Sequence, residues 1–178
     1  MRAAAALAVL ALAGCGGSGR AQAPTPEPTS PAARATPEPP TDEQHKGSTN
    51  AAAIAATGEL IRDLDAGLVF ANLVETDQVF GHRNDVHGFH GALREIDAAV
   101  GEWLQHLDPE RDLLVLTADH GCDPTRPGTD HTREHAQLLA RFASGGGRHD
   151  GPFADVGASV LRWLAGRDAA LPGNAFVP

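Results

Sequence analysis

Two apolar segments with an amphipathic segment between them limit the fold most strongly. Residues 67–74 and 112–117 are apolar runs, which predict buried strands. Between them, residues 89–107 carry apolar side chains at three- and four-residue spacing, as an amphipathic helix does. Two strands joined through a helix of this length predict a parallel, right-handed unit. The chain is therefore expected to belong to the α/β class.

Two more helices and one more strand are expected around this unit. A helix should run from Ser48 or Thr49 to about Asp65, and another over 153–165, with Gly166 as its stop. Residues 137–142 are the candidate third strand. Parallel strands are normally buried on both faces within a larger sheet. So few strands predict a truncated core that is either marginally stable alone or completed by an oligomeric partner or a second chain.

Carboxylates and imidazoles follow both expected strands. Asp77 and His82 come after the first strand, five residues apart, and Asp119 and His120 come directly after the second. Open α/β sheets bind ligands at the carboxyl ends of their strands. Such side chains are suitable ligands for a divalent metal ion.

A loop stiffened by glycine and proline follows the second pair and can carry His131 back toward it. Two such pairs would fit a two-metal site for phosphoryl transfer. The same residues also occur as helix caps and surface-loop residues. The residue pattern alone leaves both interpretations open.

Two longer motifs carry a family resemblance. NLVETDQVFGHRNDVHGF, at residues 72–89, and LTADHGCDPTRPGTDHTREH, at residues 116–135, closely resemble the C-terminal part of phosphopentomutases. These enzymes belong to the alkaline-phosphatase-like metalloenzymes, and the resemblance runs from about Lys46 to about Gly166. It implies part of an alkaline-phosphatase-like parallel sheet with flanking helices.

The resemblance also implies a metal site and a reaction. In the family two Mn²⁺ ions lie at the sheet edge, and Zn²⁺ or Mg²⁺ would accept the same ligand types. By motif, Asp77, His82 and His131 would hold one ion, while Asp119 and His120 would help to hold the other. The family reaction moves phosphate between the 1- and 5-positions of ribose or deoxyribose through a phosphorylated Thr.

The sequence departs from the family pattern in important places. No segment matches those that supply a further metal-binding Asp, the phosphorylated Thr and the cap domain that recognises the pentose phosphate. Glu75-Thr76 replaces a typical Asp-Phe pair, and residues 136–141 are less apolar than usual. No catalytic nucleophile is identified, so we expect an incomplete mutase with weak phosphatase activity at most. The alternatives are a non-catalytic metal-binding lipoprotein or a gene fragment.

Several further side chains near the motifs have two interpretations. Arg83 and Arg133 are candidate phosphate contacts, because a guanidinium fork matches phosphate oxygens, or they form surface salt bridges. His135, four residues after His131, is a candidate for orienting a metal ligand. Cys122 is expected to be a small buried residue rather than a ligand.

The N-terminus resembles that of a bacterial lipoprotein. Residues 3–13 are apolar but too short to span a bilayer, and Leu12-Ala13-Gly14-Cys15 resembles a lipobox. Residues 1–15 are therefore interpreted as a signal peptide, with lipidation of Cys15 anchoring the chain on the extracytoplasmic side of the cell membrane. The alternative is a misassigned start codon and a cytoplasmic protein.

The rest of the chain divides into a tether and a folded part. Residues 16–45 are rich in proline and should be extended and disordered, whereas residues 46–178 form the expected metalloenzyme domain. The net charge of −9 argues against nucleic acid as a partner, since phosphate binding needs a basic face.

Overall fold

A four-stranded mixed sheet is the centre of the fold. The computed structural model describes residues 5–11, 45, 49–143, 146–168, 170 and 172–178. The strands lie in the order β2-β1-β3-β4. β1 (Ala5–Ala11) runs parallel to both β2 (Leu68–Val69) and β3 (Asp112–Thr117), while β4 (Leu138–Arg141) is antiparallel to β3. The predicted partial alkaline-phosphatase-like α/β fold is confirmed.

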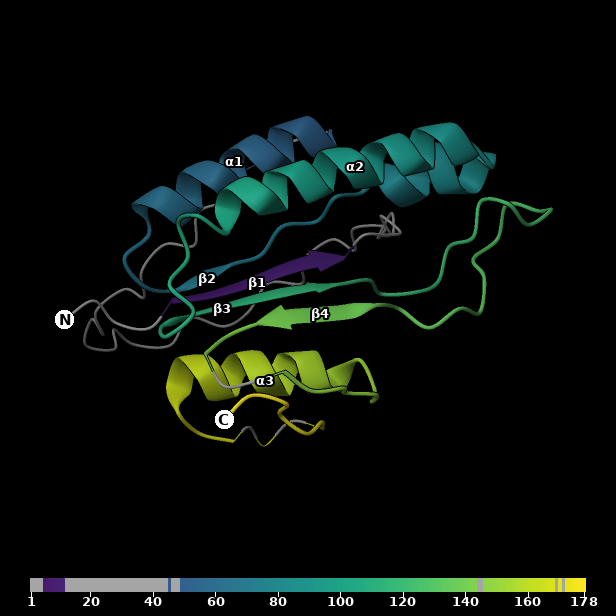
Figure 1. Ribbon diagram of the computed structural model, residues 1–178. Coiled ribbons are helices and arrows are strands. Elements are labelled where there is room, and N and C mark those ends of the chain that lie inside the picture. The colour runs from purple at the N-terminus through teal and green to yellow at the C-terminus, as the bar shows by residue number, and fades with distance from the viewer. Residues whose placement is uncertain (1–4, 12–44, 46–48, 144–145, 169, 171) are drawn as a thin grey trace, which may run out of the picture.

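Helices cover both faces of the sheet. α1 (Asn50–Asp63) and α2 (Val86–Trp103) lie side by side on one face, and α3 (Ala154–Ala165) lies on the other (Figure 1). The chain therefore has three layers, helix on sheet on helix. Among the described residues, no helix has the length and apolar character needed to cross a membrane.

Strand β3 contributes to two hydrophobic clusters, one on each face of the sheet. Leu114 and Leu116 pack with the apolar side chains of α1 and α2, whereas Leu113 and Val115 pack with α3 and the C-terminal segment. Successive side chains of a strand point to opposite faces, so a continuous apolar run is what an interior strand requires. The predicted strand over 112–117 is confirmed at both ends.

Helix boundaries follow their capping residues. Thr49 caps α1, and its hydroxyl accepts a hydrogen bond from the Ala52 N–H at 3.2 Å. Gly166 ends α3 with a φ of 62°, a conformation that glycine adopts without strain. α2 begins at Val86, earlier than predicted, because the Asp85 carboxylate accepts the Gly88 N–H at 2.9 Å.

The first predicted strand is shorter in the structure. Residues 67–74 were expected to form one strand, but the regular strand is limited to Leu68 and Val69, with a single bridge residue at Asn72. Beyond Val69, Ala71 and Leu73 stay buried while Phe70 is exposed. The apolar run therefore predicted burial correctly only at alternate positions, since Leu68 is also 49% exposed. A strand also needs a hydrogen-bonded neighbour, which the pattern does not reveal.

Strand β1 comes from a segment that the sequence interpretation assigned to the signal peptide. Ala5–Ala11 lies between β2 and β3. From the sequence, an oligomeric partner or a second chain was expected to complete the sheet. A signal peptide removed at Cys15 would be missing from this sheet, so the two roles exclude each other in one processed molecule. Cys15 lies outside the described residues, as does the Pro-rich tether apart from His45. Cleavage and lipidation stay predictions.

Candidate metal centre

Asp77 is placed by a tight turn at the end of the segment that follows β2. A π-helical turn, η1 (Thr76–Phe80), is followed by a 3-10 turn, η2 (Gly81–Arg83). The buried Thr76 hydroxyl donates to the Leu73 carbonyl at 2.9 Å, which closes the start of the turn. Short π-helical turns often occur at functional sites, because they redirect side chains.

A reciprocal pair of hydrogen bonds ties this turn to helix α1. The Asn50 N–H donates to the Glu75 carboxylate at 2.5 Å, and the Glu75 N–H donates to the Asn50 side-chain oxygen at 3.1 Å. Glu75 thus satisfies a backbone donor in the first turn of α1. It also fixes the backbone two residues before Asp77.

The Asp77 carboxylate is fully buried and lacks hydrogen bonds. Its exposed fraction is 0%, and neither oxygen has a hydrogen-bond partner. Two imidazole nitrogens lie nearby, with His82 Nε2 at 3.3 Å from Oδ2 and His131 Nε2 at 3.7 Å from Oδ1. A buried charge without hydrogen bonds or a counter-ion is costly. A cation held between these three side chains would remove that cost.

The His82 ring is oriented in the way that metal-binding imidazoles usually are. Its Nδ1 lies 2.5 Å from the Thr129 carbonyl oxygen, which can only accept a hydrogen bond. Nδ1 therefore carries the proton, and in the neutral ring Nε2 presents a lone pair toward Asp77. A lone pair facing a carboxylate oxygen is unfavourable unless a cation lies between them or Nε2 is also protonated.

His131 reaches this position because the loop after β3 folds back on itself. Gly121 and Thr132 form an isolated antiparallel bridge, and the Thr132 hydroxyl accepts the Asp123 N–H at 2.8 Å. A Cβ on Gly121 would lie 2.6 Å from the Glu134 carbonyl oxygen, so only glycine fits there. The expected return of His131 to the end of β3 is therefore observed.

Asp123 braces the same loop, as an Asx-turn residue does. Its carboxylate accepts both the N–H and the hydroxyl of Thr125, at 2.9 Å and 2.6 Å. These hydrogen bonds, with a smaller contribution from the positive charge of Arg126, lower the pKa of Asp123 below its ordinary value. A turn stabilised in this way helps to hold His131 in place.

His120 repeats the arrangement of His82. Its Nδ1 lies 3.0 Å from the Gly121 carbonyl oxygen, while Nε2 is buried without a hydrogen-bond partner, 3.6 Å from Asp119 Oδ1. The His120 and His131 rings stack with their centroids 3.6 Å apart. Asp119 and His120 thus lie directly beside the group formed by Asp77, His82 and His131.

Cys122 packs against the turn that carries His82. A Cβ on Gly81 would lie 2.5 Å from the Cys122 sulfur, so the two segments approach closely only because residue 81 is glycine. Burial, and then the negative charge of Asp77, raise the pKa of the Cys122 thiol above its ordinary value. The protonated form is thereby favoured. Cys122 is half-buried and not fully buried as the sequence predicted, and its lack of a ligand role stays a prediction.

The predicted site residues separate into a central group and a periphery. Within the described ranges, Asp77, His82 and His131 form the one group of three whose ligand atoms all lie within 4.8 Å of one another. Arg83 is exposed at the end of η2. Arg133 lines a cavity of about 550 Å³ together with His131.

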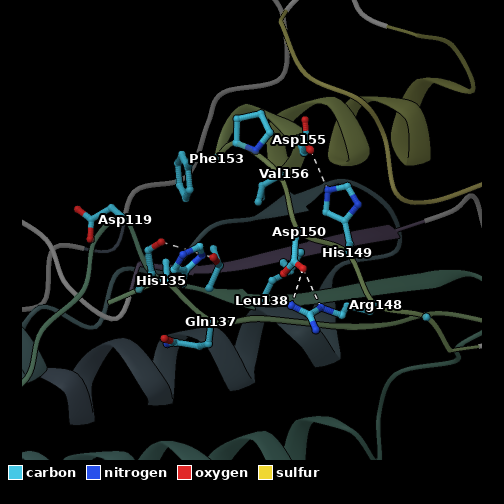
Figure 2. Close-up of a pocket in the computed structure, with 16 residues that line it drawn as sticks. Asp119, His135, Gln137, Leu138, Arg148, His149, Asp150, Phe153, Asp155 and Val156 are labelled. Carbon is cyan, nitrogen blue, oxygen red and sulfur yellow. Dashed lines mark hydrogen bonds and ion pairs between the residues drawn. The ribbon is translucent and has the colours of Figure 1, made fainter. Parts of the chain in front are cut away.

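Two features of the site could not be predicted from the sequence. The Thr129 and Gly121 carbonyls that orient the imidazoles are backbone groups, and no residue type signals them. The second feature is a cavity of about 570 Å³ beside Asp119, whose lining includes His135 and His149 (Figure 2). His149 belongs to no motif that the sequence revealed.

Comparison with known proteins gives consistent results. A family model described as the metalloenzyme superfamily matches residues 30–165. A phosphopentomutase of Anaeromyxobacter dehalogenans is 48% identical over 140 residues, which cover 77% of this chain and 35% of that protein. The phosphopentomutase of Caldanaerobacter subterraneus is 48% identical over 124 residues (67% and 31%), and that of Rhizobium leguminosarum is 45% identical over 138 residues (74% and 33%). The chain spans about a third of the length of these curated relatives.

Proposed function

This chain belongs to the metalloenzyme superfamily, and from that premise we propose that it binds divalent metal ions for phosphoryl transfer on pentose phosphates. The reaction type would be that of phosphopentomutases, between the 1- and 5-phosphates of ribose or deoxyribose. The names of the relatives support the substrate class. The observation that carries the proposal is the buried Asp77 carboxylate, which has no hydrogen bonds and faces two imidazole nitrogens.

The ligand set suits a hard or borderline cation. Asp77, His82 and His131 would hold one ion, and Asp119 with His120 would contribute to a second. Mn²⁺ is the proposed ion, with Zn²⁺ or Mg²⁺ as alternatives. The carboxylate oxygen is a ligand type that suits Mn²⁺ and Mg²⁺, and the two imidazoles are a ligand type that suits Zn²⁺. A bound ion would neutralise charge on the transferring phosphoryl group.

The protein's own residues would position the ligands and the phosphate. Thr129 and Gly121 hold the protons of His82 and His120 on Nδ1, so that Nε2 is available in each ring. Arg133 is the better placed of the two candidate phosphate contacts, since it lines a cavity with His131. Its guanidinium group would offer paired donors to phosphate oxygens.

A calorimetric titration with Mn²⁺ tests metal binding. The parent chain should bind Mn²⁺, and His131→Ala should lose one metal equivalent. His106→Ala is the matched control, because His106 is exposed beyond the end of α2 and should leave the stoichiometry unchanged. The same stoichiometry in parent and His131→Ala would refute the assignment of His131.

A metal-binding protein without turnover is the second candidate function. Its support is that the second ion has only Asp119 and His120 as ligands among the described residues, and the Asp119 side chain is 36% exposed. Phosphatase and mutase assays on the Mn²⁺-loaded chain separate the two candidates. Metal binding without turnover of ribose 5-phosphate would favour the second.

We also propose a location and a partner from the sequence. Lipidation of Cys15 would anchor the chain at the extracytoplasmic face of the membrane, with residues 16–45 as a tether. After such cleavage, another chain or a second copy would have to supply the strand between β2 and β3.

A further inference from the structure

A cavity separate from the group of three ligands opens beside Asp119. This side cavity has a volume of about 570 Å³, within the range of small-molecule sites. Its lining includes residues 117–119 at the end of β3, residues 135–138 on one wall, and residues 147–153 with the start of α3 on the other. Figure 2 shows Asp119 at one end and His149 with Asp155 at the other.

The side cavity and the metal centre share Asp119. Asp119 lines it, and Asp119 also lies 3.6 Å from the buried Nε2 of His120. The His120 ring in turn stacks on His131. A molecule whose phosphate is held at the metal centre could therefore extend past Asp119 into the side cavity.

Some of the lining residues are already engaged with each other. The Asp155 carboxylate accepts the Asn174 N–H and contacts His149 Nε2, both at 2.7 Å, and its side chain is only 4% exposed. Arg148 and Asp150 form an exposed ion pair at 2.7 Å. These groups frame the side cavity and fix the ring of His149.

The remaining lining offers hydrogen bonds and one apolar surface. The Gln137 amide can both donate and accept, and Nδ1 of His149 is the ring nitrogen not used by Asp155. Phe153 is 57% exposed, so one ring is available for packing. Sugars combine hydroxyl groups with C–H surfaces, and this lining matches both.

Charge argues against an anionic occupant. Three carboxylates, those of Asp119, Asp150 and Asp155, line the side cavity, and its one arginine is paired with Asp150. A second phosphate or a carboxylate would meet like charges there. A neutral group with several hydroxyls would not.

We propose that the side cavity is a subsite for the sugar part of a phosphate ester whose phosphate lies at the metal centre. This inference rests on the proposed metal-dependent function. It assigns recognition of the sugar to Gln137, His149 and Phe153, residues of this chain itself.

The test compares two ligands on the full chain loaded with Mn²⁺. Calorimetry should show ribose 5-phosphate binding about tenfold tighter than inorganic phosphate, which corresponds to one or two net hydrogen bonds. Gln137→Ala and Phe153→Ala should each remove a clear part of this difference, and the double variant most of it, while phosphate binding stays unchanged. Phe70→Ala is the matched control, since Phe70 is also an exposed ring (68%, against 57% for Phe153) but lies on the segment after β2, outside the side cavity.

Each result has one interpretation. Equal affinities for the two ligands in the parent, or no binding of either to the Mn²⁺-loaded chain, would refute the subsite and leave metal binding intact. Equal weakening of both ligands by Gln137→Ala and Phe153→Ala would also refute it. Failure of the parent to bind Mn²⁺ would refute the proposed function itself, together with the subsite. Thermal melts of both variants, compared with Phe70→Ala, verify that they fold.

Discussion

Replacing Asp77 with Asn should stabilise the metal-free protein. The Asp77 carboxylate is completely buried, and neither oxygen accepts a hydrogen bond. An unsatisfied buried polar group costs about 1–3 kcal/mol, and a charged one costs more. We therefore expect Asp77→Asn, which removes the charge and keeps the shape, to raise the free energy of unfolding by about 1–3 kcal/mol in the presence of a chelator.

Bound Mn²⁺ should instead make the parent more stable than the Asp77→Asn variant. At a free Mn²⁺ concentration of about 100 times Kd, one bound ion adds about 2.7 kcal/mol to the stability of the parent. The Asn variant should gain little, because it lacks the anionic ligand. Urea unfolding, followed by fluorescence of the buried Trp103, would give both free energies with and without Mn²⁺.

A second buried aspartate provides the control. Asp112 is also buried, but its carboxylate accepts the Asp108 N–H at 2.8 Å. Asp112→Asn should therefore not stabilise the chain under any metal condition. If Asp77→Asn lowers the free energy of unfolding in chelator, Asp77 is ion-paired to protonated His82 or His131 and does not need a metal ion.

Three further predictions concern other parts of the chain. The Asn174 N–H and His149 hold the pKa of Asp155 below its ordinary value of 3.8. Docking of the C-terminal segment should thus persist above that value and be lost as the pH falls through the depressed pKa. Fluorescence of Trp163 should report this acid transition, and an unchanged midpoint in Asp155→Asn would contradict it. Any phosphatase activity should disappear with a chelator and in Asp119→Ala; activity that survives both comes from elsewhere. Cys15→Ser should release the protein from membranes, and a parent already in the soluble fraction would exclude the anchor.

Much of the fold could be predicted from the sequence because local signals agreed there. The continuous apolar run of β3, the Thr49 cap of α1 and the Gly166 stop of α3 each reflect a short-range physical requirement. The family resemblance read from two motifs is likewise confirmed by relatives at 45–51% identity.

Other parts depended on partners that sequence patterns do not specify. β2 covers only Leu68 and Val69, the two residues that pair in register with β1. The placement of Ala5–Ala11 could not be predicted, since a short apolar run fits a signal peptide and a buried strand equally well. At the site, the ligand residues carried motifs, whereas the carbonyl of Thr129 and the side cavity around His149 arise only from tertiary contacts.

The position of β1 has a consequence for how the chain folds during synthesis. Ala5–Ala11 pairs with β3, which lies more than one hundred positions later in the chain and is therefore synthesised later. Closing such a loop is slow, and the sheet stays open until β3 has been made. During that interval Ala5–Ala11 lacks one of its two strand neighbours. If this segment also served as the proposed signal peptide, export and sheet formation would compete for it. In that case the relative speed of the two processes would decide whether a given molecule keeps Ala5–Ala11 in its sheet or loses it.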